Sequence, residues 1–343
     1  MQALAEARAN IALVKYWGKL DAALNLPAVP SLSLTVDALT TRTSVRFDPS
    51  RTLDALFIDQ KPADPRALGR VSRHLDRVVG SAAANARMFA EVRSTNDFPT
   101  AGGLASSASA FAALTLAAVA AAGRESDPTK LSVLARQASG SAARSILGGL
   151  VLLGVGTPGQ VDSSFATQVA SEGEWPDLRL VIGIASEAPK EIASTDGMNQ
   201  SESSPYYAPW TSSAPADIAR AMDAIARRDL PALGAVAERS ALRMHACALA
   251  ADPGVVYLRG PTVEGLHAIR KLRARGVPAW FTCDAGPHPK ALTSPEDAAQ
   301  VARALAEVPG IQRTIIAAPG KGALLLDGQR VSASSFTPET RIA

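Results

Sequence analysis

Small residues and hydroxyl groups gather in one segment that could bind a phosphate. Gly102 and Gly103 precede Ser106 and Ser107, and the Ala- and Leu-rich run 110–122 that follows has high helix propensity. A glycine turn leading into a helix N-terminus directs backbone N–H groups outward, beside the positive end of the helix dipole. The two serines are also suited to capping that helix. The sequence therefore predicts either a phosphate loop or an ordinary capped core helix.

Two commoner nucleotide loops are excluded by their context. The Gly-Lys pairs at 18–19 and 320–321 lack the rest of the Walker A pattern. Three glycines within 154–159 have dinucleotide-loop spacing, but Pro158 lies among them and no helical pattern follows. The segment 96–109 would be a phosphate loop of a third type.

Two other segments carry groups that could contact an anionic ligand. Ser139, Gly140 and Ser141 precede Arg144, so hydroxyls, N–H groups and a guanidinium fork could form a second oxyanion pocket. A purely structural turn is the alternative. The turn 15–19 carries two lysines and two aromatic residues, which in isolation is typical of a solvated hairpin end.

Composition bounds the class of protein. The 343 residues are 47% hydrophobic and 20% charged, with a net charge of +3, which indicates a globular chain and gives nucleic-acid binding no support. Two cysteines, Cys247 and Cys283, favour a reducing compartment, and we read Cys283 as a small buried residue. His245 and Cys247 are too few for a metal site. Without a signal core or a bilayer-length apolar run, we expect a cytoplasmic protein with no membrane contact.

Periodicity predicts layers of strands and helices on both sides of a polar boundary at 172–177. Before it we expect strands at 9–14, 31–36, 41–47 and 89–94, and helices at 64–79, at 110–122 and from 128. Beyond it we expect strands at 178–186 and 279–282 and a pair of strands at 314–318 and 323–326. We also expect helices at 216–227, 230–250, 262–275 and 296–307, a polar loop at 189–198 and an ordered loop at 205–213. The domains predicted are 1–172, with the phosphate loop, and 178–343. The arginines of 64–79 are expected to lie mostly on a solvated face.

Four segments together resemble one family, over nearly the whole chain. The loop Pro99–Ser109 is similar to the phosphate loop of the galactokinase, homoserine kinase, mevalonate kinase and phosphomevalonate kinase superfamily. Within it, the order and spacing of the four segments resemble diphosphomevalonate decarboxylase. These segments are Ala9–Lys19, Asn96–Ala108, Ser139–Ser145 and Asp284–Pro287.

The resemblance implies a fold and a reaction. The fold is α+β with two domains, an N-terminal α/β domain of the ribosomal-protein-S5-like type and a C-terminal ferredoxin-like α+β domain. The reaction uses ATP and Mg²⁺ to phosphorylate the C3 hydroxyl of 5-diphosphomevalonate, after which phosphate and CO2 leave to give isopentenyl diphosphate. The family also suggests a homodimer.

The resemblance assigns the catalytic roles. Asp284 would orient or deprotonate the tertiary alcohol, which is a poor nucleophile. Lys15 would keep Asp284 ionised, because a nearby opposite charge favours the carboxylate. Arg144 would hold the substrate carboxylate that departs as CO2.

The resemblance also assigns the binding residues. Substrate-binding positions are Tyr16, Trp17, Gly18, Lys19, Arg66, Ser139, Gly140, Ser141, Arg144, Ser194, Thr195 and Met198. ATP-binding positions are Asn96, Pro99, Gly102, Gly103, Leu104, Ala105, Ser106 and Ser107, with Ser107 beside Mg²⁺.

Departures from the family pattern leave alternatives open. His288-Pro289-Lys290 follows the Asp-Ala-Gly-Pro segment in place of the common Asn, and some bacterial members have Arg where Thr195 stands. Both lie on the diphosphate side, so a decarboxylase acting on phosphomevalonate is one alternative. A mevalonate-type kinase and a catalytically silent metabolite sensor are the others.

Overall fold

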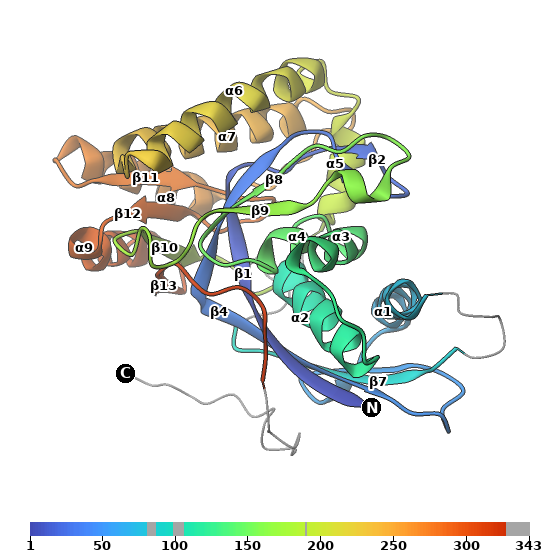
Figure 1. The fold of residues 1–343 in the computed structure, drawn as a ribbon. Coiled ribbons are helices and arrows are strands. Elements are labelled where there is room, and N and C mark those ends of the chain that lie inside the picture. The colour runs from blue at the N-terminus through green and yellow to red at the C-terminus, as the bar shows by residue number, and fades with distance from the viewer. Residues whose placement is uncertain (81–86, 99–105, 189–190, 327–343) are drawn as a thin grey trace.

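The chain forms two β-sheets with helices packed against them (Figure 1). The computed structural model describes residues 1–80, 87–98, 106–188 and 191–326. Among these residues, no helix is long and apolar enough to cross a bilayer.

The first sheet is built around two long antiparallel strands, β1 (Gln2–Val14) and β4 (Ser31–Phe47). The first part of β4 also pairs with β8, and its last part pairs with β7. The remaining strands of this sheet are β5 (Ala55–Ile58), β6 (Lys61–Pro62), β7 (Ala90–Asn96), β8 (Leu150–Leu153), β9 (Ala166–Ala170) and β14 (Leu324–Leu325). A separate small hairpin joins β2 (Lys19–Asp21) and β3 (Leu26–Pro27).

The helices of this half lie against the first sheet. They are α1 (Pro65–Val79), α2 (Ser106–Ala121), α3 (Pro128–Ala138) and α4 (Ala142–Ser145), with a short 3₁₀ turn at Val161–Ser163. An acidic residue followed by proline starts α1 and α3: Asp64 accepts a hydrogen bond from the N–H of Ala67, and Asp127 from that of Lys130. Val45 and Val92 of the sheet, with Leu75 of α1 and Phe111 of α2, belong to one buried cluster.

The second sheet has the antiparallel order β11-β12-β10-β13. Its strands are β10 (Arg179–Ile184), β11 (Ala279–Thr282), β12 (Lys290–Thr293) and β13 (Arg313–Ala317). Its helices are α5 (Ser194–Ser201), α6 (Tyr207–Ala226), α7 (Leu230–Leu249), α8 (Gly260–Ala274) and α9 (Pro295–Ala306). This strand order, with helices inserted after β10 and β12, is the split βαβ arrangement of a ferredoxin-like domain.

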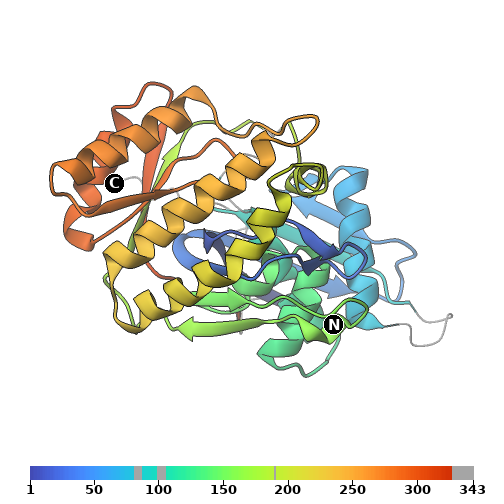
Figure 2. The same ribbon diagram turned by 90° about the horizontal axis from the view of Figure 1, so that it is seen from above.

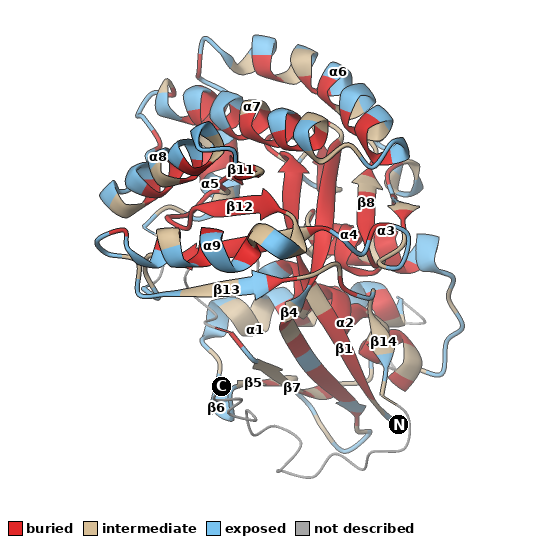
Figure 3. Cartoon of the chain, turned by 90° about the vertical axis from the view of Figure 1, so that its left-hand side faces the viewer, coloured by how far each residue is buried: buried red, intermediate tan, exposed pale blue. Residues whose placement is uncertain are grey.

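Helices α6 and α7 run side by side across the junction of the two halves (Figures 1 and 2). One buried cluster contains Ile11 and Leu34 of the first sheet, Leu180 of the second and Leu233 of α7. Figure 3 shows α7 buried on one side and exposed on the other, as an amphipathic helix requires. The halves therefore share a continuous apolar core.

Several sequence predictions are wrong in detail. The expected strands 31–36 and 41–47 form one strand. Its pairing with β1 shifts register between Thr35 and Thr40 but continues on both sides of this irregularity. The expected loop 205–213 is mostly helix, since Pro209 lies in the first turn of α6, where its missing N–H costs no helical bond.

Two other predictions fail near the ends of the second half. Part of the expected loop 189–198 is helix α5, which begins at Ser194. The expected pair 314–318 and 323–326 does not pair with itself: β13 joins β10 in the second sheet, while β14 returns to pair with β1 in the first.

Candidate active site

A cavity of about 920 Å³ collects side chains from both halves of the chain. The end of β1, helix α1, the turn between α3 and α4, helix α5 and the loop after β11 all contribute to its wall. The candidate residues that line it are Lys15, Tyr16, Trp17, Lys19, Arg66, Ser107, Ser139, Gly140, Ser141, Arg144, Ser194, Thr195, Met198 and Asp284. Segments far apart in the sequence thus meet around one space.

A few candidate residues lie elsewhere. Pro99, Gly102, Gly103, Leu104 and Ala105 lie outside the described residues. Asn96 and Ser106 line a neighbouring pocket. Gly18 is not in the cavity wall; its φ of 99° turns the chain before Lys19, and a Cβ there would collide with the Tyr207 hydroxyl. Trp17, by contrast, does line the cavity; it is otherwise buried, and its indole N–H donates to the Ser201 hydroxyl at 2.9 Å.

The loop that carries Asp284 joins β11 to β12 and is anchored at three points. The Thr262 hydroxyl donates to the carbonyl of Pro287 at 2.6 Å, and the N–H of Ala185 donates to His288 Nδ1 at 3.2 Å. The N–H of Gly183 donates to the carbonyl of Pro289 at 2.9 Å. These anchors give Asp284 a rigid mount at the cavity wall.

Two ammonium groups hold the Asp284 carboxylate. Lys15 Nζ lies 2.6 Å from Oδ1, and Lys290 Nζ lies 3.0 Å from Oδ2. Burial alone would raise the pKa of Asp284, but the two lysines outweigh it and hold that pKa well below its usual range. The carboxylate is therefore ionised at neutral pH.

Lys15 is fixed between the two halves of the molecule. Its backbone N–H donates to the Ser240 hydroxyl at 2.9 Å, and its ammonium also donates to the carbonyl of Ala12 at 2.7 Å. Burial lowers the pKa of Lys15 despite the neighbouring Asp284 carboxylate. This lysine lines the cavity directly.

Arg144 presents a buried guanidinium held by neutral groups. It donates to the Ser31 hydroxyl at 2.7 Å and the Ser33 hydroxyl at 3.0 Å, both on β4, and to Asn10 Oδ1 at 3.3 Å. Burial lowers its pKa to about 10, so the group is charged at neutral pH. Because these partners are neutral, the positive charge remains available to an anion in the cavity.

Tyr16 lies beside Arg144, with the guanidinium 5.9 Å from the ring centre. Burial raises the pKa of Tyr16 to about 12, so its hydroxyl keeps its proton. Within the described part of the chain, that hydroxyl has no hydrogen-bond partner. Gly140 is required here, because a Cβ at this position would collide with the Tyr16 hydroxyl.

The arginines of α1 lie on a solvated face, as the sequence predicted, and they also line the cavity. This holds for Arg66, Arg70, Arg73 and Arg77, all of which are exposed. Their spacing of three or four residues sets them on one stripe of the helix. Four neighbouring cations make this side of the cavity attractive to a polyanion.

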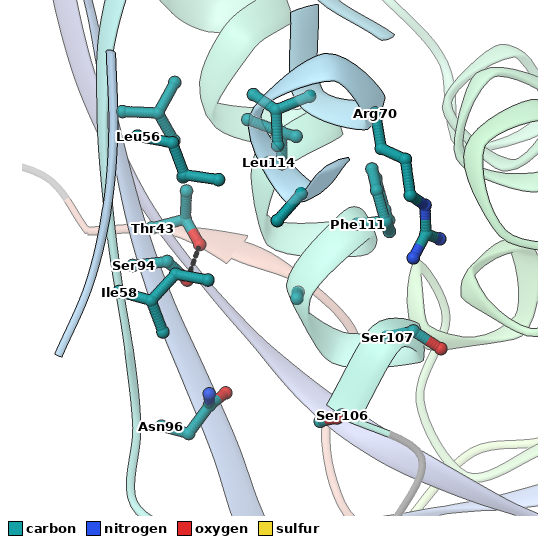
Figure 4. Close-up of a pocket in the computed structure, with 14 residues that line it drawn as sticks. Thr43, Leu56, Ile58, Arg70, Ser94, Asn96, Ser106, Ser107, Phe111 and Leu114 are labelled. Atoms are coloured by element: carbon teal, nitrogen blue, oxygen red, sulfur yellow. Dashed lines mark hydrogen bonds between the residues drawn. The ribbon is translucent and has the colours of Figure 1, made fainter. Parts of the chain in front are cut away.

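A second, largely apolar pocket adjoins the cavity between α1, α2 and strands β4, β5 and β7 (Figure 4). Leu56, Ile58 and Leu114 line it, and the Thr43 and Ser94 hydroxyls hydrogen-bond to each other at 2.9 Å on its wall. Ala67, Arg70 and Ser107 line both spaces, so the two adjoin each other.

The first turn of α2 differs from the capping prediction. Ser106 and Ser107 are the first residues of α2 itself and do not precede it. The Ser107 hydroxyl lies 3.5 Å from that of Ser139. These serines therefore stand where the apolar pocket meets the cavity.

Sequence reasoning missed the second lysine at Asp284. Lys290 is 1% exposed and begins the buried strand β12. A lone lysine opening an apolar run just after Asp-Ala-Gly-Pro was the available signal, because a buried lysine needs a partner. Across the residues that the structure describes, no group of three or more His, Cys, Asp or Glu side chains could hold a metal ion.

Family models match both halves of the chain. A diphosphomevalonate decarboxylase-like N-terminal domain matches residues 7–166, and a mevalonate 5-diphosphate decarboxylase C-terminal domain matches residues 180–323. The diphosphomevalonate decarboxylase of Aspergillus fumigatus is 35% identical over 305 residues, which are 84% of this chain and 75% of the relative. The human diphosphomevalonate decarboxylase is 34% identical over 314 residues, 86% of this chain and 78% of the relative.

Solved structures agree over nearly the whole fold. The mevalonate diphosphate decarboxylase of Staphylococcus aureus superposes with a TM-score of 0.89 at 34% identity, covering 95% of this chain and 98% of that one. A structure described as MDDEF in complex with MVAPP, AMPPCP and magnesium has a TM-score of 0.89 at 35% identity, covering 95% and 99%. The expected α+β two-domain fold is confirmed.

Proposed function

The chain belongs to the diphosphomevalonate decarboxylase family, and from this premise we propose how its residues serve the reaction. The enzyme catalyses the ATP-dependent decarboxylation of 5-diphosphomevalonate to isopentenyl diphosphate, in the mevalonate route to isoprenoids. ATP and Mg²⁺ are its cofactors. The observation that carries the assignment of residues is the ionised Asp284 facing the same cavity as the Arg144 guanidinium.

Asp284 acts on the C3 hydroxyl. Its side chain is rigidly mounted, lines the cavity and is 22% exposed, so the carboxylate can accept a hydrogen bond from the alcohol and orient the oxygen toward the phosphoryl group. Lys15 fixes Oδ1 and keeps the carboxylate ionised. The alcohol proton passes toward Asp284 as the new O–P bond to the γ-phosphorus forms and the bond from that phosphorus to ADP breaks.

Arg144 holds the substrate carboxylate. Its planar fork suits two-point binding of a carboxylate, and its neutral protein partners leave the charge uncompensated. The C–C bond that breaks is thereby aligned with the C3–O bond that carries the phosphate. Since C3 gains positive character as that bond breaks, the buried setting of Arg144 also limits attack by water.

The cationic side of the cavity binds the diphosphate. Tyr16, Lys19, Arg66 and the segment Ser139–Ser141 supply hydroxyl, N–H and charged donors, which suit phosphate oxygens. On the opposite wall, helix α5 contributes Ser194, Thr195 and Met198.

The nucleotide occupies the two adjoining spaces beside α2. The apolar pocket of Figure 4 suits the base, and Ser106, Ser107 and Arg70 lie where the phosphates must pass toward Asp284. The positive end of the α2 dipole favours those phosphates. Ser107 supplies a hydroxyl ligand for Mg²⁺, which neutralises charge on the transferred phosphoryl group when bound.

We also propose that the enzyme is a homodimer and works in the cytoplasm. Both follow from the sequence expectation and the family premise. Size-exclusion chromatography with light scattering tests the first, and cell fractionation tests the second.

One assay tests the function. The protein is given ATP, Mg²⁺ and, in separate reactions, mevalonate, its 5-phosphate or its 5-diphosphate, and ADP and CO2 are measured independently. We expect both products with the 5-diphosphate. ADP without CO2 would indicate a kinase, both products with the 5-phosphate alone would indicate a phosphomevalonate decarboxylase, and neither product with any substrate would indicate a sensor.

A further inference from the structure

Lys290 is a buried charge that the sequence analysis did not single out. It opens β12, which lies between β10 and β11, and its residue is 1% exposed. Lysine is almost never buried so fully without a charged partner. Its ammonium lies 3.0 Å from Asp284 Oδ2 and 3.4 Å from the carbonyl of His288. The carboxylate of Asp284 is therefore its charge partner.

The two lysines at Asp284 stand in different places. Lys15 lines the cavity, whereas Lys290 is not part of the cavity wall. Lys290 therefore approaches the carboxylate from the protein side and has no access to a ligand. Its contact with Oδ2 complements that of Lys15 with Oδ1, so both oxygens are held.

Anchoring the loop does not explain Lys290. Thr262, Gly183 and Ala185 already fix the loop at Pro287, Pro289 and His288, through uncharged hydrogen bonds. A buried ammonium adds a desolvation cost that such a loop does not require. The desolvation of the Lys290 ammonium is explained if the Asp284 carboxylate itself must be held in one orientation.

We propose that Lys290 is a positioning residue for the reaction: by holding Oδ2 from behind, it fixes the rotation of the Asp284 carboxylate toward the C3 hydroxyl. Two ammonium contacts on separate oxygens define the plane of the carboxylate, while Lys15 alone would leave it free to turn about its bond to Cβ. The inference rests on the proposed role of Asp284.

The first test is the pH dependence of kcat/KM for Lys290→Met, which removes the charge and keeps most of the side-chain length. We expect kcat to fall about 10- to 100-fold, because a misaligned catalytic group costs this much. KM for 5-diphosphomevalonate changes by no more than about threefold, because Lys290 does not touch the substrate. The acidic limb moves to higher pH, because losing an ammonium raises the pKa of Asp284.

Other charged or titratable groups near Asp284 must be distinguished from it as the source of the acidic limb. These are Lys15 at the end of β1, Arg144 on α4, His245 on α7 and the Cys283 thiol. If the limb belonged to His245, whose pKa burial lowers to about 4, removing Lys290 would leave it nearly in place. Thr282→Val is the matched control: Thr282 is the buried cross-strand neighbour of Lys290, and this variant should keep the wild-type limb.

The second test needs no activity. Asp284→Asn leaves two buried ammonium groups without their carboxylate and should lower Tm, and adding Lys290→Met should restore part of that loss. Additive losses of Tm, or an unchanged kcat in a folded Lys290→Met enzyme, would overturn the proposal. Should Lys290→Met alone fail to fold, a folded double variant still supports the pairing, and an unfolded one refutes it. Failure of the proposed function would instead appear as a wild-type enzyme without CO2 release.

Discussion

Asp284 and Asp217 each have two or more cationic partners, but the two carboxylates differ in exposure. Asp284 is 22% exposed to the cavity, while its partners Lys15 and Lys290 are each 1% exposed. Asp217 on α6 is 1% exposed, while its partners are 59% (Arg220), 33% (Arg239) and 41% (Arg243) exposed. In one cluster the anion faces the open space and the cations are buried; in the other the cations reach solvent.

The difference separates a reactive group from a structural one. At Asp217 the arginines of α6 and α7 are 33–59% exposed, and the carboxylate ties the two helices together. At Asp284 both lysines are fully desolvated, and the remaining access to the carboxylate is from the cavity. Two desolvated lysines around a carboxylate at the cavity wall are typical of a catalytic site and are unfavourable for stability alone.

Asp284→Asn should have the largest effect on catalysis. Asparagine keeps the shape but cannot accept the alcohol proton, so kcat should fall by about 10²–10⁴-fold. ADP release in a single turnover measures it, with Asp217→Asn as the matched control that should keep its rate. Near-normal turnover in Asp284→Asn would remove the distinction between the two clusters.

Arg144→Ala should impair decarboxylation more than phosphoryl transfer. Loss of the guanidinium leaves the substrate carboxylate without its cation, so CO2 release should fall more than ADP formation, by about tenfold or more. Rapid quench would then trap a 3-phosphorylated intermediate. Arg144→Lys, which keeps the charge without the fork, should show a milder form of the same imbalance. Strictly proportional losses of ADP and CO2 would assign Arg144 to an earlier step.

Asp217→Asn should lower stability and spare catalysis. The three arginines lose a charged acceptor, but they can turn to solvent, so we expect a loss of about 1–3 kcal/mol in the free energy of unfolding. Urea unfolding measures it, beside kcat under standard conditions. An unchanged midpoint, or a loss of kcat in the folded variant, would show that the two clusters do not differ in the way we infer.

Arg220→Gln should have the smallest effect. Arg220 is the most exposed partner of Asp217, at 3.3 Å, and exposed ion pairs contribute little, so the loss should stay within about 0.5 kcal/mol. Arg239→Gln is the comparison. It removes the least exposed of the three arginines and should lower the free energy of unfolding more than Arg220→Gln does. A larger loss for Arg220→Gln than for Arg239→Gln would contradict the role given to exposure.

Much of this site could be predicted from local sequence patterns. Lys15, Arg144 and Asp284 stand in short distinctive segments, and the structure brings them to one cavity as the resemblance implies. The fold class also followed from these segments. Their roles stay predictions until the variants are measured.

What could not be predicted depends on tertiary contacts. Nothing local to Lys290 reveals that its ammonium meets Asp284, since that contact needs the β11–β12 hairpin to close. The cavity-facing position of Arg73 and Arg77 depends on how α1 docks, because the helical pattern alone equally permits a solvated face. Prolines misled the interpretation of 205–213, since proline is tolerated in a first turn.

The return of β14 to β1 has a consequence for synthesis and for truncation. Leu324 and Leu325 pair with Glu6 and Ala5, so part of the outer edge of β1 stays uncovered until almost the whole chain has left the ribosome. Uncovered strand edges recruit other chains, and newly made proteins can aggregate in this way. A chain truncated before residue 324 should therefore aggregate more readily than the full chain, although every cavity-lining segment is still present.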